Sequence, residues 1–402
     1  MIELFAEKEN CCGCEACVNR CPKNAISMEE DEYGFLYPAI TRELCIECHC
    51  CEVVCPLKTE TKFHEEAEVF IASSKDEKAK MKSSSGGLFF ELAKQIVLDG
   101  GTVYGALYNQ DWTLCHSEVK TVESLAALQG SKYVQSRIGI IYQNVKKELE
   151  KGNPVLFSGT PCQVDGIKKF LPKLYEKLFL VDIVCHGVPC QKMFKDFLNF
   201  TSKKENAVIK KIEFRDKTRG WGITGKFVMC TPSGKEKAKR TDGSNSAYYD
   251  YFLRSATYRD SCYDCKYANP KRVSDITLGD YWGAECEHPD FSRKVNLFYG
   301  VSAVMVNTDK GQALLDMISP NIFFEKSSID KAKRRNGQLR RSTQKPDFYY
   351  TVMNQYRDKG YIGLNSYWKR TEFRRILINK GKELVPLKLK FLIKQNICKL
   401  ER

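Results

Sequence analysis

Two runs of cysteines near the start of the chain have the spacing of iron–sulfur ligands. Each run reads C-x2-C-x2-C-x3-C-P, first over residues 11–22 and again over residues 45–56. The tight C-x2-C-x2-C arc lets three thiolates face one cluster, and the fourth cysteine of each run binds the other cluster in two-cluster proteins. We therefore predict two 4Fe–4S sites, with ligands Cys11, Cys14, Cys17 and Cys55 in the first and Cys45, Cys48, Cys51 and Cys21 in the second.

Zinc sites and disulfides are the alternatives at these cysteines. Structural zinc sites usually present separated C-x2-C pairs, and disulfides require an oxidising compartment. Duplication of the whole run favours clusters instead. Residues 1–60 resemble a bacterial two-cluster ferredoxin, and Cys12 and Cys50 fall outside its ligand pattern.

Four later cysteines are candidate ligands of a third 4Fe–4S cluster. They are Cys162 at an expected helix start, Cys185 at the end of an expected strand, and Cys262 and Cys265 in a C-x2-C loop. A thiol at a helix N-terminus has a lowered pKa, which suits ligation. Spacing alone leaves a small zinc site or buried free cysteines open, and Cys190 and Cys286 are rival ligands.

A serine- and glycine-rich segment over residues 83–87 is a candidate phosphate cradle. It opens an expected helix, where hydroxyls and glycine amides form a positive, donor-rich end. The alternative is simple capping of that helix. Ser131 and Lys132 could place a second hydroxyl and an ammonium beside the same phosphates. No G-x-G-x-x-G motif follows an expected strand, so a Rossmann site for NAD is not supported.

The loop over residues 215–222 mixes cations with Trp221. Such a loop could grip an anionic, ring-bearing substrate, and the alternative is a solvated hairpin turn. Within it we expect Lys217 and Arg219 to bind the anionic part of an electron acceptor.

Strands and helices alternate between about residue 69 and about residue 200, which predicts an α/β domain with a mixed or partly parallel sheet. Strands are expected over 69–73, 102–108, 154–158 and 178–185, and helices over 88–98, 138–151 and 192–200, with another ending at residue 170. Further along we expect two strands around a charged loop over 207–231, a helix over 248–258, a loop region over 261–284, a strand over 299–307 and a helix over 311–318.

The composition fits an ordinary globular protein of two or three domains, because 43% of its 402 residues are hydrophobic and 28% are charged. The net charge of +14 is unevenly placed: residues 1–60 hold 12 acidic and 5 basic residues, whereas residues 321–402 hold 7 acidic and 21 basic ones. This asymmetry suits docking of redox partners or anionic cofactors. The acidic start carries no export signal and no apolar run reaches about 20 residues, so we expect a cytoplasmic protein.

The basic tail holds a candidate amphipathic helix. Its apolar face would comprise Leu389, Leu392, Ile393, Ile397 and Leu400. Such a helix can lie on the anionic inner face of a membrane, and packing on the protein's own body is the alternative. Nucleic acid is not an expected partner, because no recognised binding motif accompanies the arginine pairs.

Six motifs follow the ferredoxin-like segment in order. They are SSGG over 84–87, GSKYVQS over 130–136, SGTPCQ over 158–163, CHGVP over 185–189, CYDC over 262–265 and LGDYWG over 278–283. Together they resemble the family of beta subunits of the coenzyme F420 hydrogenases and dehydrogenases, over about residues 66–310. The resemblance implies a non-covalent FAD, an iron–sulfur cluster beside it, and electron exchange with a deazaflavin or another organic acceptor.

The resemblance also assigns expected roles to residues. FAD contacts are expected at Ser84, Ser85, Gly86, Gly87, Ser131, Lys132, Gly159 and Thr160, and the third cluster at Cys162, Cys185, Cys262 and Cys265. The expected architecture is a ferredoxin-like domain over 1–60, a mixed-sheet α/β or α+β flavin-binding domain over 66–310, and a basic, mainly helical region over 311–402.

The expected function is that of an iron–sulfur flavoprotein oxidoreductase. Clusters carry one electron at a time, whereas a flavin handles one or two. The expected partners are a redox protein or reduced ferredoxin and a small organic acceptor. The alternatives are a non-catalytic relay protein that only hands electrons to a separate enzyme, and an accessory reductase in envelope polysaccharide synthesis.

Overall fold

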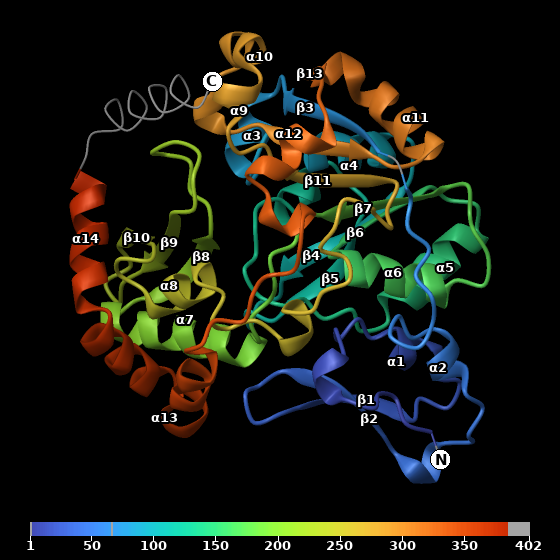
Figure 1. The fold of residues 1–402 in the computed structure, drawn as a ribbon, viewed down its shortest axis with the longest axis horizontal. Coiled ribbons are helices and arrows are strands. Elements are labelled where there is room, and N and C mark those ends of the chain that lie inside the picture. The colour runs from blue at the N-terminus through green and yellow to red at the C-terminus, as the bar shows by residue number, and fades with distance from the viewer. Residues whose placement is uncertain (1, 66, 385–402) are drawn as a thin grey trace.

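The structure is a computed structural model that describes residues 2–65 and 67–384 (Figure 1). Its N-terminal module contains a hairpin of β1 (Ile26–Glu30) and β2 (Leu36–Ile40). Each cysteine loop leads into a short helix, α1 (Ala16–Arg20) or α2 (Cys50–Val53). The predicted ferredoxin-like domain is confirmed.

A large mixed sheet forms the centre of the molecule. Its strands run in the order β13 (Ile322–Lys326), β3 (Glu68–Ser74), β12 (Ser302–Val306), β11 (Ile276–Asp280), β7 (Leu178–Ile183), β6 (Val155–Gly159), β4 (Thr102–Tyr108) and β5 (Leu114–Val119). The inner strands β11, β7, β6 and β4 are parallel, and the flanking pairs are antiparallel. Nearly continuous apolar runs in β6 and β7 explain this, because parallel strands are buried on both faces. The predicted mixed sheet is therefore confirmed.

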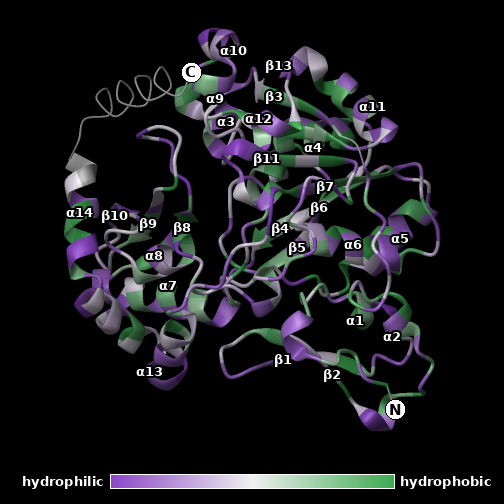
Figure 2. Cartoon of the chain, in the orientation of Figure 1, coloured by the Kyte–Doolittle hydropathy of each residue, from purple (hydrophilic) through white to green (hydrophobic). Residues whose placement is uncertain are grey.

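Helices cover both faces of this sheet. Residues of α4 (Leu88–Leu98) and α11 (Asp309–Ile318) pack on one face, and residues of α5 (Ile141–Glu150) and α6 (Pro161–Phe170) on the other. The N-terminal module lies beside α5 and α6, where Cys14 and Val54 share their hydrophobic core (Figure 1). Hydrophobic residues gather along the central strands, and the outer helices carry more hydrophilic ones (Figure 2).

A second, smaller sheet lies on the other side of the molecule (Figure 1). It joins β10 (Glu236–Thr241), β9 (Gly225–Cys230) and β8 (Val208–Glu213) antiparallel to one another. An aromatic-rich core unites it with α7 (Gln191–Glu205), α8 (Ala247–Leu253) and α13 (Tyr349–Thr371). The remaining helices are α3 (Glu77–Lys82), α9 (Ala284–Glu287), α10 (Pro289–Lys294), α12 (Ile329–Arg334) and α14 (Phe373–Leu384).

Two expectations from the sequence need correction. The region expected to be a loop, 261–284, contains β11, which lies in the middle of the central sheet. The domain boundary expected at residue 310 is also displaced, because α11 packs on this sheet and β13 pairs with β3. The expected amphipathic stretch over 389–400 lies outside the described residues. Within residues 2–65 and 67–384, no helix is both long and apolar enough to cross a membrane.

Candidate redox site

Two small cavities in the N-terminal module each collect four of the predicted ligand cysteines. Cys11, Cys14, Cys17 and Cys55 line one, and Cys21, Cys45, Cys48 and Cys51 line the other. The fourth cysteine of each run thus lies with three cysteines of the other run, as in two-cluster ferredoxins. Apolar side chains complete both walls, including Leu4 and Met28 in the first and Ile26 and Ile40 in the second. Four sulfur donors in an apolar shell suit a 4Fe–4S cluster.

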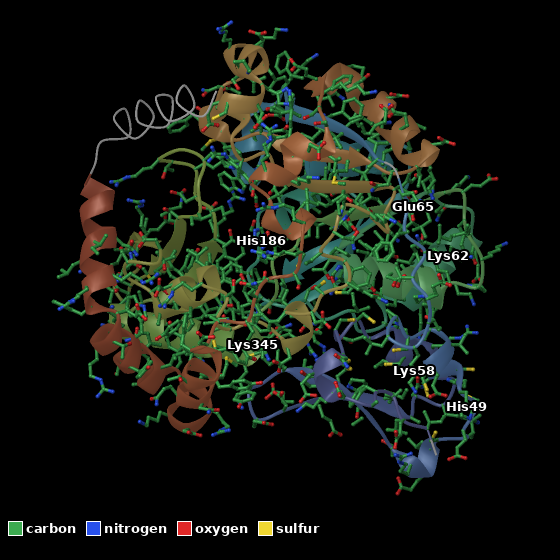
Figure 3. The ribbon with its side chains drawn as sticks, in the orientation of Figure 1. His49, Lys58, Lys62, Glu65, His186 and Lys345 are labelled. Carbon is green, nitrogen blue, oxygen red and sulfur yellow. The ribbon has the colours of Figure 1, made fainter. Side chains whose placement is uncertain are left out.

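The two sites differ in their surroundings. The first site, at Cys11, Cys14, Cys17 and Cys55, faces the body, since a Cβ on Gly166 of α6 would lie 3.3 Å from Cys14 Sγ. The second site, at Cys21, Cys45, Cys48 and Cys51, lies at the periphery: Cys48 is exposed, and the adjacent His49 is at the outer rim of the module (Figure 3). The first site is therefore the one that can communicate with the rest of the chain.

Two buried charged side chains fasten the first site to the body. Glu15 accepts hydrogen bonds from Arg137 Nε at 2.9 Å and from the backbone amides of residues 138 and 139. Arg259 donates from Nη1 to the carbonyl oxygen of Cys11 at 2.9 Å and from Nε to Gln135 Oε1 at 3.0 Å. Buried charges require such partners, so these contacts fix how the module sits on the body.

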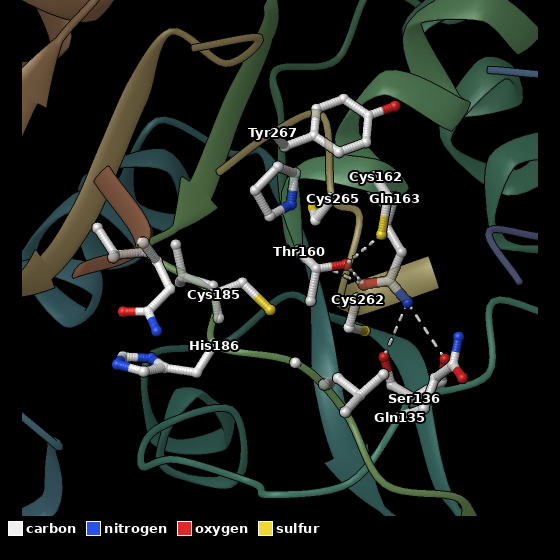
Figure 4. Close-up of a pocket in the computed structure, with 18 of the residues that line it drawn as sticks. Gln135, Ser136, Thr160, Cys162, Gln163, Cys185, His186, Cys262, Cys265 and Tyr267 are labelled. Atoms are coloured by element: carbon white, nitrogen blue, oxygen red, sulfur yellow. Dashed lines mark hydrogen bonds between the residues drawn. The ribbon is translucent and has the colours of Figure 1, made fainter. Parts of the chain in front are cut away.

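A much larger cavity, of about 1050 Å³, opens at the carboxyl ends of β6, β7 and β11. It is lined by all four candidate ligands of the third cluster, Cys162, Cys185, Cys262 and Cys265 (Figure 4). Parallel strands end at the same edge of a sheet, and ligand sites commonly form there. The topology therefore gathers cysteines that lie up to about 100 residues apart in the sequence.

Local structure places each of these cysteines. Thr160 and Gln163 form a capping box at the start of α6, and Pro161 occupies its first turn, so Cys162 lies in the N-terminal turn. Cys185 comes two residues after β7. Burial, with the neighbouring Cys265 thiol, raises the pKa of Cys185 to about 12. Crowded, buried thiols ionise only beside a strong positive centre, and metal coordination supplies one.

Cys12 is a site residue that the spacing pattern did not identify. It lines both the first module cavity and the large cavity. Hydrogen bonds from the Cys14 and Cys162 thiols lower its pKa. Cys12 therefore lies between the first site and the third set of cysteines. The sequence did offer one signal for the role of Cys12, which is its position directly after Cys11. Two adjacent side chains in a tight loop point in different directions, so Cys12 can face a second site.

The two rival ligands lie elsewhere. Cys190 is the N-cap residue of α7, where its thiol donates to the carbonyl oxygen of Tyr33 at 3.2 Å and accepts from the amide of Met193. Cys286 belongs to α9. Neither residue lines the large cavity.

The structure brings together the two segments predicted to bind phosphate. Ser84 Oγ and Ser131 Oγ lie 2.6 Å apart on the wall of the large cavity. Gly87 stands at the N-cap of α4 with φ +88°, and no side chain caps this helix. The first amides of α4 and the two hydroxyls thus form a donor-rich surface that suits an anion.

The other predicted cofactor residues have different roles. Ser85, Lys132, Gly159 and Thr160 also line the cavity, whereas Gly86 does not. A Cβ on Gly86 would lie 2.6 Å from the carbonyl oxygen of Ala72, so this glycine permits close packing of the segment against β3. Lys132 Nζ donates to the carbonyl oxygens of residues 127–129, and burial lowers its pKa to about 7.

The two residues expected to bind the acceptor do not reach this cavity. Lys217 is buried, and its Nζ donates to the carbonyl oxygens of Lys80, Ser85 and Tyr299 at 2.6–2.7 Å. Its ammonium therefore supports the 83–87 segment from behind. Arg219 is exposed. Arg215, from the same loop, is the cation that lines the cavity.

Comparisons with known proteins agree with this architecture. Residues 152–332 match the family model for the C-terminal part of the coenzyme F420 hydrogenase/dehydrogenase beta subunit, and residues 10–59 match that of a 4Fe–4S dicluster domain. The chain is 22% identical to one of the subunits of the F(420)H(2) dehydrogenase of Methanosarcina mazei over 246 residues, which are 58% of this chain and 68% of the relative.

Two further similarities were found. An uncharacterised ferredoxin of Methanocaldococcus jannaschii is 36% identical over 55 residues, which are 14% of this chain and 70% of the relative. A chain in the solved F420-reducing nickel–iron hydrogenase complex of Methanosarcina barkeri aligns with a TM-score of 0.42 and 16% identity, over 78% of this chain and 96% of that one.

The fold and the cysteine sites define an iron–sulfur protein of the oxidoreductase type. Through residues 152–332 the chain is related to the beta subunits of coenzyme F420 hydrogenases and dehydrogenases, and it carries a 4Fe–4S dicluster domain at its N-terminal end. The family resemblance seen in the ordered motifs is thereby confirmed.

Proposed function

We propose that this protein is an iron–sulfur flavoprotein that passes electrons between three 4Fe–4S clusters and a bound FAD, and exchanges them with an organic acceptor in either direction. One observation carries the proposal: the third set of cysteines and the Ser84–Ser131 anion surface line the same cavity. A cluster and a phosphate-bearing cofactor could therefore occupy one chamber.

The chamber suits a dinucleotide-sized cofactor. Ligand pockets usually measure about 300–1,000 Å³, and this cavity reaches about 1050 Å³. The hydroxyls of Ser84 and Ser131 and the first amides of α4 would hold the phosphates of FAD. When bound there, FAD would supply the exchange between one-electron and two-electron transfer.

A buried polar network holds the cysteine side of the chamber in place. Gln163 Nε2 donates to Ser136 Oγ at 3.1 Å, and Ser136 Oγ lies 3.1 Å from His116 Nδ1. Burial lowers the pKa of His116 to about 4, so this ring stays neutral. Thr160 Oγ1 lies 3.1 Å from Cys162 Sγ. A hydrogen bond to a ligand sulfur is one means of tuning the potential of an iron–sulfur cluster.

The arrangement supports an order of electron transfer. Cys48 of the second site is exposed, the first site lies against α6, and Cys12 lies between the first site and Cys162. We propose that electrons move between the second, first and third clusters in that order, or in reverse.

A redox protein is the proposed partner at the second site. Leu44, Ile46 and Val53 are each more than half exposed in the stretch that carries Cys45, Cys48 and Cys51. Exposed apolar groups on an acidic module offer a surface for a protein with complementary charge.

The proposed acceptor is coenzyme F420 or another organic molecule. The curated relative of Methanosarcina mazei is named for F(420)H(2), and the matching family model is named for coenzyme F420. These names support a deazaflavin as the first compound to test.

The proposal is tested by counting iron and acid-released flavin in anaerobically purified protein. We expect about twelve irons and one FAD per chain, because each cluster holds four irons. Cys262→Ser should lower the iron count toward eight, whereas Cys190→Ser, a buried cysteine outside the chamber, should leave it at twelve. An unchanged count in Cys262→Ser would contradict the third cluster, and intact clusters without flavin would favour the electron-relay alternative.

A further inference from the structure

Arg215 lines the large cavity and carries one donor nitrogen that has no hydrogen-bond partner among the described residues. Its side chain is only 5% exposed. Nε donates to the carbonyl oxygen of Gly222 at 2.8 Å, and Nη1 to Asp280 Oδ2 at 2.5 Å. Nη2 is fully buried and has no hydrogen-bond partner among the described residues. A buried guanidinium donor without a partner is costly and rare, which points to a group that binds there.

The surrounding side chains hold Arg215 in one orientation. Asp280, at the end of β11, also accepts from Trp221 Nε1 at 3.1 Å. Trp221 stacks on Trp282 with ring centroids 4.3 Å apart and an interplanar angle of 10°. The guanidinium carbon of Arg215 lies 5.2 Å from the centroid of Trp282. The free Nη2 is therefore preorganised, which lowers the cost of binding a ligand.

The charge and access at this wall suit an anion that comes from solvent. Asp280 pairs with the Arg215 guanidinium, and burial, with the nearby Arg215 charge, lowers the pKa of Lys217 to about 7. Ile223, which follows in the same segment and also lines the cavity, is 44% exposed, so this part of the lining reaches solvent. The surface proposed for the FAD phosphates already has its own donors at Ser84, Ser131 and α4. Arg215 is thus available to a second, exchangeable ligand.

Resting on the proposed function, we propose that Arg215 binds the anionic group, a carboxylate or a phosphate, of the organic molecule that exchanges electrons with the flavin. Asp280 and Trp221 act as positioning residues for it. The Arg215 site would make the chamber selective for acidic acceptors, since a guanidinium matches carboxylate and phosphate oxygens.

The test measures binding to the holoprotein, because Trp221 and Trp282 report on this wall through their fluorescence. The probes are coenzyme F420, which has an anionic tail, and the pair FMN and riboflavin, which share a ring but differ in a phosphate. We expect tighter binding of F420 and FMN than of riboflavin. Arg215→Gln should lower the affinity for F420 and FMN about tenfold or more, which is equivalent to about 1.4 kcal/mol. Its affinity for riboflavin should not change.

Two controls separate this proposal from its alternatives. Arg219→Gln removes an exposed cation of the same loop and should bind all three probes like the wild type, and Arg215→Lys should recover part of the affinity. Loss of FAD from Arg215→Gln would overturn the proposal, since Arg215 would then hold the cofactor. Equal affinities in wild type and Arg215→Gln would overturn it as well.

The outcome also distinguishes this proposal from the proposed function. The wild-type protein could bind FMN but not F420, and Arg215→Gln could abolish that binding of FMN. This result would support the anion site and exclude the deazaflavin as the acceptor. Wild-type protein that holds no flavin would contradict the proposed function by itself, before any probe is added.

Discussion

The N-terminal module and the central chamber assemble cysteine sites in opposite ways. The module takes eight cysteines from one stretch of 45 residues, and two small, apolar cavities enclose them. The chamber takes its cysteines from α6, the end of β7 and the 262–265 loop, and leaves about 1050 Å³ open beside them. The module has room only for clusters, whereas the chamber has room for clusters and a cofactor. This contrast fits the proposal that the module transfers electrons and that the chamber holds the cofactor that reacts with the acceptor.

The largest expected effect comes from removing a buried charge in the wall of the chamber. Arg272 donates from Nη2 to Asp182 Oδ2 at 3.1 Å, and both side chains are buried. Arg272→Met would leave the Asp182 carboxylate unpaired, so we expect a loss of about 3–5 kcal/mol in the free energy of unfolding, measured in denaturant.

The Arg272→Met variant also tests whether the two regions are separate. Arg272→Lys is the matched control, because it keeps the charge and should lose less stability. The module clusters should persist in the folded fraction of Arg272→Met. Simultaneous loss of all iron at low denaturant would show that the regions form a single cooperative unit.

A somewhat smaller effect is expected where the two regions meet. Arg259→Met would remove the donors to the carbonyl oxygen of Cys11 and to Gln135 Oε1. Because these buried acceptors would be left unsatisfied, we expect the free energy of unfolding to fall by about 2–4 kcal/mol. Limited proteolysis should then cut the chain near residues 57–67, between module and body. Wild-type resistance to cleavage in Arg259→Met would mean that other contacts suffice to hold the module.

Changes at the anion surface should affect only the chamber. Ser131→Ala removes the partner of Ser84 and should weaken FAD binding about fivefold to tenfold, which corresponds to about 1 kcal/mol for one hydrogen bond. Flavin content after gel filtration measures this effect, and the iron count should not change. Ser124→Ala, in the exposed part of a 3-10 helix (Glu123–Ala127), is a control that should retain FAD. Full retention of FAD in Ser131→Ala would place the phosphates elsewhere.

The smallest expected effect concerns the contact between the two regions. Cys12→Ala should keep about twelve irons but shift the potential of the third cluster by about 20–60 mV toward lower values, because one hydrogen bond near Cys162 is lost. An EPR-monitored redox titration measures the shift. If the iron count fell toward eight, Cys12 would be a ligand and our assignment of the third set would be incomplete.

Helices and strands with a strong local pattern could be predicted from the sequence, whereas elements that depend on contacts with distant residues were predicted less well. The bounds expected for α4 and β4 agree with the structure, because each has a strong apolar pattern and clear glycine boundaries. β11 was missed because Leu278–Gly279–Asp280 reads as a turn, although the sheet buries this strand on both faces. β10 was missed because its alternating lysines and arginine resemble a solvated segment.

The same distinction applies to the residues of the candidate site. The loop over 215–222 was expected to bind an anionic substrate through Lys217 and Arg219, but Arg215 is the cation of this loop that lines the cavity. Tertiary packing turns Lys217 toward three backbone carbonyls and Arg215 toward the chamber. Cys12 was overlooked for a similar reason, since its role depends on the docking of the module against α6.

Counting the electrons that one chain accepts tests the central claim most directly. We predict that anaerobic reductive titration of the holoprotein takes up about five electrons per chain, one for each of three clusters and two for FAD. An uptake of about two electrons, with no flavin absorbance to bleach, would contradict the account, because only the N-terminal module would then carry redox centres.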